Sequence, residues 1–304
     1  MKLQTPVTDE RCSVSISYDD RIMMLGSCFS EHIGRQLADF GFDVCINPFG
    51  TLYNPVSILH SIEMLLGEGH FTEEDAVDVG AGSGLVCSFS HHTSFACRDT
   101  GEFLDKSNTA LDKAREYFRS CNKVIITLGT SWCFRHNTSG RIVSNCLKRP
   151  AAEFTRERLT VGEAAGYLAR IRQLCDKAAE ERGGFAEKQF IYTVSPIRHF
   201  KDGAHGNQLS KSTLLLAVDT ITDEGKIEYF PAYEIVMDEL RDYRFYAEDM
   251  FHPSLQTTDY IRERFLTWAL PKSEHSRLEE NIRAFRRSQH ISKHYFFTIF
   301  LAGM

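Results

Sequence analysis

The chain has 304 residues, of which 42% are hydrophobic and 25% are charged, the proportions of an ordinary globular protein with room for a large core. Its formal net charge is −6 and no run of Lys and Arg stands out, which argues against nucleic acid as a partner. Gly and Pro are too few for a collagen-like or linker-dominated chain.

The first predicted element is a buried strand at Arg21–Gly26, an apolar run that ends in glycine. Apolar residues at the spacing of one helix face follow it, and Gly41 is placed to end that helix. These apolar residues are Phe29, Ile33, Leu37 and Phe40. The chain therefore begins as a strand, a tight turn and a helix.

Strands and helices alternate along the rest of the chain. Further strands are predicted at residues 43–46, 123–129 and 190–194, with an extended segment at 85–95 and a short last strand at 242–246. Helices are predicted at residues 56–66, 107–121, 160–181, 210–218 and 233–240. This alternation predicts an α/β fold with a largely parallel sheet and helices on both of its faces.

Four polar loops each follow a predicted strand. They are Gly26–Cys28, Asn47–Asn54, Gly129–Trp132 and Ser195–His199. The carboxyl ends of parallel strands share one edge of a sheet, and open α/β sheets bind their ligands outside that edge. The four loops therefore predict an active site there.

Cys28 lies directly after a predicted strand, at the first turn of a predicted helix. Backbone N–H groups and the helix dipole at such a position stabilise a thiolate and lower the pKa of the thiol. The same N–H groups can then bind an oxyanion. The alternative role is that of a small buried apolar residue, which is common for a free cysteine.

A candidate partner for Cys28 lies near the C-terminus, where Asp249 and His252 are three residues apart. In a short turn this spacing lets the carboxylate reach the Nδ1–H of the ring, which leaves Nε2 free to act as a base. Pro253 prevents the chain from continuing as a helix. The alternative is an aspartate that caps a helix beside a surface histidine.

Together these segments resemble the GSCFA family, within the SGNH (GDSL-type) hydrolase superfamily. Gly26–Ser30 looks like the signature of that family, and the segment from Asp249 to Ser254 looks like the superfamily's Asp-x-x-His motif. Residues 47–55, 128–132 and 195–203 also look like the family, so the resemblance runs from about Gly26 to Trp268. It implies a three-layer α/β/α, flavodoxin-like fold.

The sequence departs from the superfamily pattern at the nucleophile and at the groups that bind the oxyanion. The pattern has a serine two residues after the glycine, where this chain has Cys28, and an aspartate where it has Ser27. Cys28 is therefore the expected nucleophile, and Ser27 is the alternative if the turn is shifted by one residue. Ser131 takes the place of an oxyanion-binding asparagine, and Gly50 best matches a glycine whose N–H also donates.

Further polar residues are expected to border the substrate. Arg198 follows a predicted strand onto the same edge, where an arginine can hold a carboxylate or a phosphate. The alternative for Arg198 is a structural ion pair. Asn54, Gly129 and His199 lie in the same predicted loops and complete the candidate binding set.

The nine cysteines form no C-x-x-C pair and are odd in number, which argues against a disulfide framework and a thiolate zinc site. Residues 1–11 lack the apolar stretch of a signal peptide, and no apolar run is long enough to span a membrane. We therefore expect free thiols, a cytoplasmic protein without a membrane span, and no metal or cofactor.

These observations predict one α/β domain at residues 1–272 and a helical extension at 273–304. The expected activity is that of a hydrolase or acyltransferase acting on an ester or other acyl compound, either a small molecule or a carbohydrate-linked group. In it Cys28 attacks the carbonyl, His252 takes the thiol proton, Asp249 orients His252, and the N–H groups of Cys28 and Gly50 bind the oxyanion. The alternative is a non-catalytic ligand-binding protein with the same fold. The oligomeric state is left open.

Overall fold

The computed structural model describes residues 5–8 and 12–302, with the backbone alone from residue 290 onward. At its centre is a five-stranded parallel sheet with the strand order β10-β9-β5-β1-β2. The strands are β1 (Arg21–Gly26), β2 (Asp43–Ile46), β5 (Lys123–Leu128), β9 (Gln189–Val194) and β10 (Ile227–Tyr229). Numbered along the chain, these parallel strands have the order 2-1-3-4-5 of flavodoxin-like sheets, which confirms the predicted fold class.

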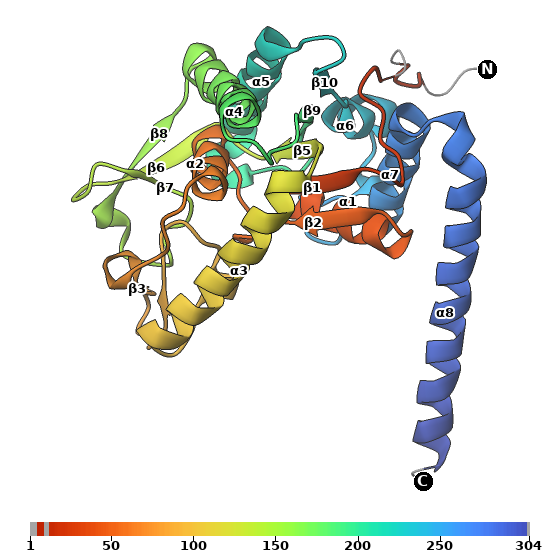
Figure 1. Ribbon diagram of the computed structural model, residues 1–304, viewed down its shortest axis with the longest axis horizontal. Helices are drawn as coiled ribbons and strands as arrows, with labels where there is room; N and C mark the ends of the chain where they lie inside the picture. Colours follow the sequence, from red (N-terminus) through yellow and green to blue (C-terminus); the bar gives the residue numbers. More distant parts are fainter. Residues whose placement is uncertain (1–4, 9–11, 303–304) are drawn as a thin grey trace.

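Helices cover both faces of this sheet and make three layers (Figure 1). On one face lie α1 (Cys28–Asp39) and α7 (Leu255–Ala269), and on the other α2 (Pro55–Leu66), α3 (Thr100–Ser120), α4 (Val161–Glu181) and α5 (Gly203–Ile221). Successive side chains of a strand point to opposite faces. Met23 and Leu25 accordingly join the core on the α2–α5 side, whereas Ile22 and Met24 join the core beneath α1 and α7.

Two small antiparallel sheets extend from the central one. The first pairs β3 (Val77–Asp78) with β4 (Val86–Cys87), and the second has the order β7-β6-β8. The extended segment predicted at residues 85–95 is wrong beyond β4, because the chain turns where His91 N–H donates to Ser88 O at 3.1 Å.

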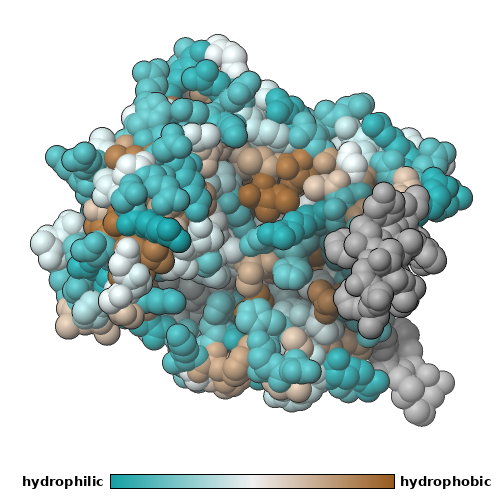
Figure 2. Space-filling model, turned by 90° about the horizontal axis from the view of Figure 1, so that it is seen from below, coloured by the Kyte–Doolittle hydropathy of each residue, from teal (hydrophilic) through white to brown (hydrophobic). Residues whose placement is uncertain are grey.

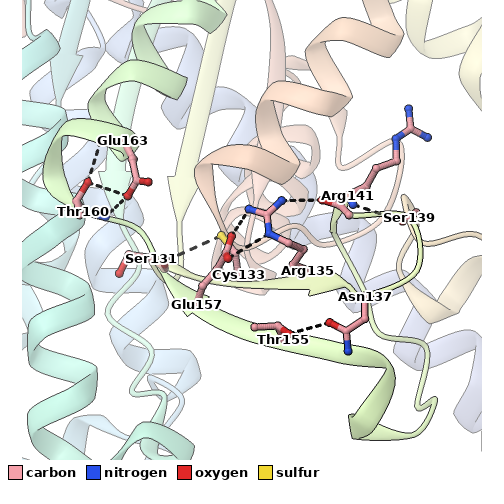
Figure 3. A network of polar contacts seen from close by, with 11 residues as sticks. Ser131, Cys133, Arg135, Asn137, Ser139, Arg141, Thr155, Glu157, Thr160 and Glu163 are labelled. Atoms are coloured by element: carbon pink, nitrogen blue, oxygen red, sulfur yellow. Dashed lines mark hydrogen bonds and ion pairs between the residues drawn. The ribbon is translucent and has the colours of Figure 1, made fainter.

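The second small sheet forms an arm that starts directly after the loop at Gly129. Its strands are β6 (Trp132–His136), β7 (Ile142–Val143) and β8 (Phe154–Arg158), none of which was predicted. An ion pair between Arg135 on β6 and Glu157 on β8 ties the two longer strands together, with Nε and Oε2 3.2 Å apart (Figure 3). The arm is anchored to Ser131, whose carbonyl accepts the N–H of Leu159 at 2.9 Å.

The segment before α7 is helical rather than extended. After α6 (Ala232–Glu234) the chain forms a π-helix at Ile235–Leu240 and a 3-10 turn at Tyr243–Phe245. The strand predicted at residues 242–246 is wrong, because the Asp242 side chain accepts the N–H of Arg244 at 2.9 Å and folds the chain into a turn.

The last helix, α8 (His275–Ala302), leaves the domain along one side (Figure 1). Near its start Phe285 packs edge-on against Phe40 with ring centres 6.0 Å apart, and Asn281 Nδ2 donates to Phe40 O at 2.8 Å. Figure 2 shows that hydrophilic side chains cover much of the face seen from below, with apolar side chains gathered in smaller patches.

Candidate active site

The carboxyl ends of β1, β5 and β9 lie side by side and carry three of the four predicted loops. Ser27 N–H donates to Thr127 O at 3.2 Å, and Ser195 N–H donates to Leu128 O at 2.8 Å. These bonds tie the chain after β1 and the chain after β9 to the end of the strand between them. We call this edge the rim; it is the edge at which open α/β sheets bind ligands.

Gly26 lets the chain pass from β1 into α1 in a single sharp turn. Its φ is +140°, and a Cβ at this position would lie 2.2 Å from Thr127 O. Its N–H donates to Asn47 Oδ1 at 2.9 Å. Only glycine fits so close an approach, so this residue fixes Ser27 before the helix and Cys28 as its first residue.

Cys28 is half-buried at the first turn of α1. Burial raises the pKa of its thiol, while the N–H groups of Cys28 and Phe29 and the charge of Lys211 lower it and the charge of Glu31 raises it. The N–H groups at the helix N-terminus lower this pKa as expected, but the desolvation of a thiolate outweighs them, so the net shift is upward. A reactive Cys28 needs a group that takes its proton.

Ser27, the alternative nucleophile, is fully buried. Within the part of the chain that the structure describes, its Oγ has no hydrogen-bond partner. Cys28 is the more exposed of the two candidate residues, since it is only half-buried.

His252 and Asp249 make the contact expected from their spacing. His252 Nδ1 lies 2.6 Å from Asp249 Oδ2, while Asp249 Oδ1 accepts the N–H groups of His252 and Phe251, each at 2.9 Å. These bonds, the two from the backbone first, lower the pKa of Asp249 to about 2. An ionised carboxylate can only accept, so Nδ1 of the ring carries a proton, and in the neutral form of the ring the lone pair is on Nε2.

The turn that carries His252 is attached to the loop after β9. Arg198 N–H donates to Phe251 O at 3.1 Å, and Arg198 Nη1 donates to Met250 O at 3.4 Å. The turn therefore lies at the rim, and the charge that His252 carries in its protonated form contributes to lowering the pKa of His199. Among the residues described, no hydrogen bond joins His252 to Cys28 or Ser27.

The glycines expected to assist in binding an oxyanion already use their N–H groups. Gly50 N–H donates to Asn47 O at 2.8 Å, and Gly129 N–H donates to Tyr53 O at 2.8 Å. Asn54 caps α2, with its Oδ1 accepting the N–H of Ser57 at 2.9 Å. All three groups hold the loops of the rim in place.

Ser131 is also engaged within the protein. Its Oγ donates to Ser210 Oγ at 3.2 Å, and its N–H donates to the same oxygen at 2.8 Å. The N–H groups of Cys28 and Phe29, unlike the donors of Gly50 and Ser131, point to the sulfur, since both lower the pKa of the Cys28 thiol. They are the donors best placed for negative charge that develops beside the sulfur.

Arg198 lies among aromatic side chains at the rim. Its guanidinium carbon is 4.2 Å from the ring centre of Phe200, 5.3 Å from that of Tyr243 and 5.5 Å from that of Tyr246. No carboxylate of residues 5–8 or 12–289 forms an ion pair with it, so the structural ion pair considered for Arg198 is not present there. Its charge is available to an anionic group.

His199 is half-buried beside Tyr53, with the two ring centres 6.3 Å apart. Burial, followed by the charges of Lys211 and His252, lowers its pKa to about 3. Its Nε2 has no partner in the described structure. At neutral pH it is therefore an uncharged ring at the rim.

The sequence reasoning missed Lys211 and Asn207, both on α5. Lys211 is fully buried, and its Nζ donates to Gly129 O at 2.6 Å and to Ser195 O at 2.7 Å. Asn207 Oδ1 accepts the N–H of His199 at 2.9 Å. The sequence did contain a sign of Lys211. Asn207, Lys211 and the apolar Leu214 are spaced to lie on one face of a helix, and a lysine on an apolar helix face is unusual.

Comparison with known families decides the relationship of the chain. A model of the GSCFA family matches residues 21–265. The chain belongs to the GSCFA family. The match covers the whole central sheet of this GSCFA protein together with the candidate site, and it ends within α7. No curated protein and no solved structure matches the chain.

Across the described residues of the GSCFA chain, no helix is both long enough and apolar enough to cross a membrane. The same residues hold no group of three or more His, Cys, Asp or Glu side chains arranged to bind a metal ion.

Proposed function

We propose that this GSCFA protein is an acyl hydrolase or acyltransferase of the SGNH type. Its substrate is an ester or other acyl compound, either a small molecule or a carbohydrate-linked group. Cys28 is the nucleophile, and His252, oriented by Asp249, moves the protons of the acyl-transfer steps. No step calls on a metal or an organic cofactor.

The contact between Asp249 and His252 carries this proposal. The 2.6 Å contact fixes the tautomer of a histidine whose Nε2 is left for proton transfer. The turn is bound to the loop after β9, and Cys28 follows β1 at the same rim. A nucleophile at a helix N-terminus and an oriented histidine at one strand edge are the parts that covalent acyl transfer needs.

The proposed reaction begins when His252 Nε2 takes the proton of the Cys28 thiol and Cys28 Sγ attacks the acyl carbon. The N–H groups of Cys28 and Phe29 donate to the oxyanion of the tetrahedral intermediate. The carbon–oxygen bond to the leaving group then breaks, and His252 supplies the proton that the leaving alcohol needs. Water or an acceptor alcohol, activated by His252, attacks the thioester and regenerates the thiol.

Trapping of the acyl-enzyme tests this reaction. After incubation with 4-nitrophenyl acetate, intact-mass and peptide analysis should find one acetyl group on Cys28, and Cys28→Ala should abolish it. Cys146→Ala is the matched control, because Cys146 is another partly buried cysteine that lies outside the loops of the rim. Acetylation lost in Ser27→Ala and kept in Cys28→Ala would make Ser27 the nucleophile. If no ester or thioester acylates the wild-type protein, the proposal is overturned.

A specific observation favours the alternative of a non-catalytic binding protein. Gly50 N–H and Ser131 Oγ, the expected oxyanion donors, both have partners within the protein. Loss of one such donor lowers the rate of enzymes that use an oxyanion hole by about 10²–10³-fold. A protein that binds acyl compounds in calorimetry, without any acyl-enzyme or turnover, would support this alternative.

We further propose that the protein works in a reducing compartment such as the cytoplasm. All nine cysteines are free thiols in the structure. Titration of the unfolded protein should give the same number of thiols with and without reductant. A lower number without reductant would contradict this location.

A further inference from the structure

Four aromatic side chains gather around Arg198 at the rim. The ring centres of Phe200 and Phe251 are 5.5 Å apart, and those of Tyr243 and Tyr246 are 6.0 Å apart. The Arg198 guanidinium lies over three of these rings, those of Phe200, Tyr243 and Tyr246. We call the four rings the aromatic platform, which joins an apolar surface to one positive charge.

The aromatic platform is open to solvent. Tyr243 is 60% exposed and Phe251 is 40% exposed. Large apolar side chains are mostly buried, and exposed ones that gather in a patch mark interaction sites. A surface this open suits a ligand that lies across it better than one that is enclosed in a cavity.

Phe251 is held beside His252 through its backbone. Asp249 Oδ1 accepts the N–H groups of Phe251 and His252, each at 2.9 Å, and Phe251 O accepts the N–H of Arg198 at 3.1 Å. The carboxylate that orients the His252 ring therefore also fixes the edge of the platform. A ligand on the platform is held next to the turn that carries His252.

The charge of Arg198 favours an anionic ligand. Its Nη1 donates to Met250 O at 3.4 Å, and among residues 5–8 and 12–289 it has no carboxylate partner. Arg244, its neighbour at the rim, is paired with Asp242, with Nη2 and Oδ2 2.9 Å apart. A guanidinium has five N–H donors, and its planar edge fits a carboxylate with two parallel hydrogen bonds.

Tyr243 adds a hydroxyl to this surface. In the part of the chain that the structure describes, no group hydrogen-bonds to that hydroxyl. Aromatic faces attract C–H groups, and a phenolic hydroxyl both donates and accepts hydrogen bonds. A ligand that matches the platform therefore carries C–H groups, hydroxyls and a carboxylate. A uronic acid residue has all three on one ring, and its chain can continue across an open surface.

We propose that the aromatic platform binds a uronic acid residue of an acidic oligosaccharide. Its carboxylate lies on Arg198 and its C–H face on the exposed rings of Tyr243 and Phe251. The acyl group that reacts is then an ester on a hydroxyl of the same oligosaccharide. The inference rests on the proposed acyl transfer for this last step, whereas the binding needs no reaction.

Calorimetry with unacylated oligosaccharides tests the platform without any turnover. A hexasaccharide of glucuronic or galacturonic acid should bind wild type about 10–100-fold more tightly than the hexasaccharides of glucose and galactose, the usual effect of a hydrogen bond to a charged group. Arg198→Met should remove this preference. Arg198→Lys keeps the charge without the planar fork and should restore only part of it. Tyr243→Ala should weaken binding by about 3–10-fold.

Arg244→Met and Leu216→Ala are the matched controls. Arg244 is the neighbouring arginine whose charge is already paired, and Leu216 is an apolar residue of α5 that is 55% exposed. Both variants should bind the acidic hexasaccharide as wild type does. Neutral hexasaccharides that bind as tightly as the acidic ones would overturn the proposal without any variant. Equal losses in Arg198→Met and Arg244→Met would overturn it as well.

The same proteins separate this inference from the proposed reaction. If acidic hexasaccharide binds and Arg198→Met abolishes the binding, but no ester or thioester acylates the protein, the platform is supported and the reaction alone is overturned. If Cys28 is acylated but no acidic hexasaccharide binds, the platform alone is overturned. Binding of benzoate without binding of any hexasaccharide would exclude a sugar as the ligand.

Discussion

The role of His252 can be tested because its removal should change activity and stability very differently. The side chain is 51% exposed, and its ring makes its hydrogen bond to the exposed Asp249. An exposed ion pair of this kind contributes little to the free energy of unfolding. Replacing His252 by alanine should therefore leave the melting temperature close to that of wild type.

Acyl transfer should respond far more strongly. A positioned acid or base accounts for about 10²–10⁴-fold of a reaction rate, which corresponds to about 2.7–5.4 kcal/mol of transition-state stabilisation. We therefore expect kcat/KM for 4-nitrophenyl acetate to fall by that factor in His252→Ala. Asp249→Asn should lower kcat as well, since an amide does not hold the Nδ1–H tautomer as a carboxylate does.

The protein contains a matched control for this experiment. His70 Nε2 lies 2.8 Å from Asp112 Oδ1, and its side chain is 48% exposed, so it forms an equivalent pair outside the rim. His70→Ala should leave both the rate and the melting temperature near those of wild type. If His252→Ala loses no more activity than His70→Ala, the assignment of His252 to proton transfer is refuted.

Two further predictions concern a buried histidine and an unpaired arginine. Burial lowers the pKa of His91 to about 3, so the free energy of unfolding should fall by about 1.4 kcal/mol per pH unit as the pH drops from about 6 toward 3, and denaturant titrations should show a shallower fall in His91→Phe. Equal slopes in the two proteins would contradict this. Arg198→Met should raise KM about 10–100-fold for an acyl ester that carries a carboxylate and leave a neutral ester unchanged, because a hydrogen bond to a charged group contributes about 1.5–3 kcal/mol. Arg244→Met, which removes a guanidinium paired with Asp242, is the control, and an equal effect of both variants would exclude a special role for Arg198.

The sequence was sufficient to predict the layout of the fold. Apolar residues fill the middle of strands such as Arg21–Gly26 and Lys123–Leu128, as is typical of strands covered on both faces, and the structure pairs these two strands side by side in parallel. The polar loops after these strands then had to meet at one edge. The Asp249–His252 contact was also predictable, because it is local and depends on a spacing of three residues.

Properties that depend on burial could not be predicted in the same way. The position of Cys28 at a helix N-terminus indicated a lowered pKa, but the structure buries the thiol enough to raise it. Likewise the resemblance placed Ser131 where an oxyanion-binding asparagine is expected, whereas in the structure its hydroxyl donates to Ser210 Oγ, a residue far away in the chain. Desolvation and competing partners come from residues that only the folded chain brings together. Lys211 differs, because its place on a buried stripe of α5 is visible in the sequence.

Gly26 is constrained both by its own backbone conformation and by the neighbouring strand β5. Its substitution tests the turn that positions Cys28. A methyl group there would lie 2.2 Å from the carbonyl oxygen of Thr127, at a φ of +140° that side chains rarely adopt. Strain and overlap together predict a loss of roughly 2–6 kcal/mol in the free energy of unfolding for Gly26→Ala, and a displaced nucleophile in any protein that still folds. Gly162→Ala on α4, where a Cβ meets no atom within 4 Å, should instead stabilise the protein by about 0.5 kcal/mol. If Gly26→Ala unfolds at the same denaturant concentration as wild type and acylates equally fast, the sharp turn is not what places the sulfur at the rim.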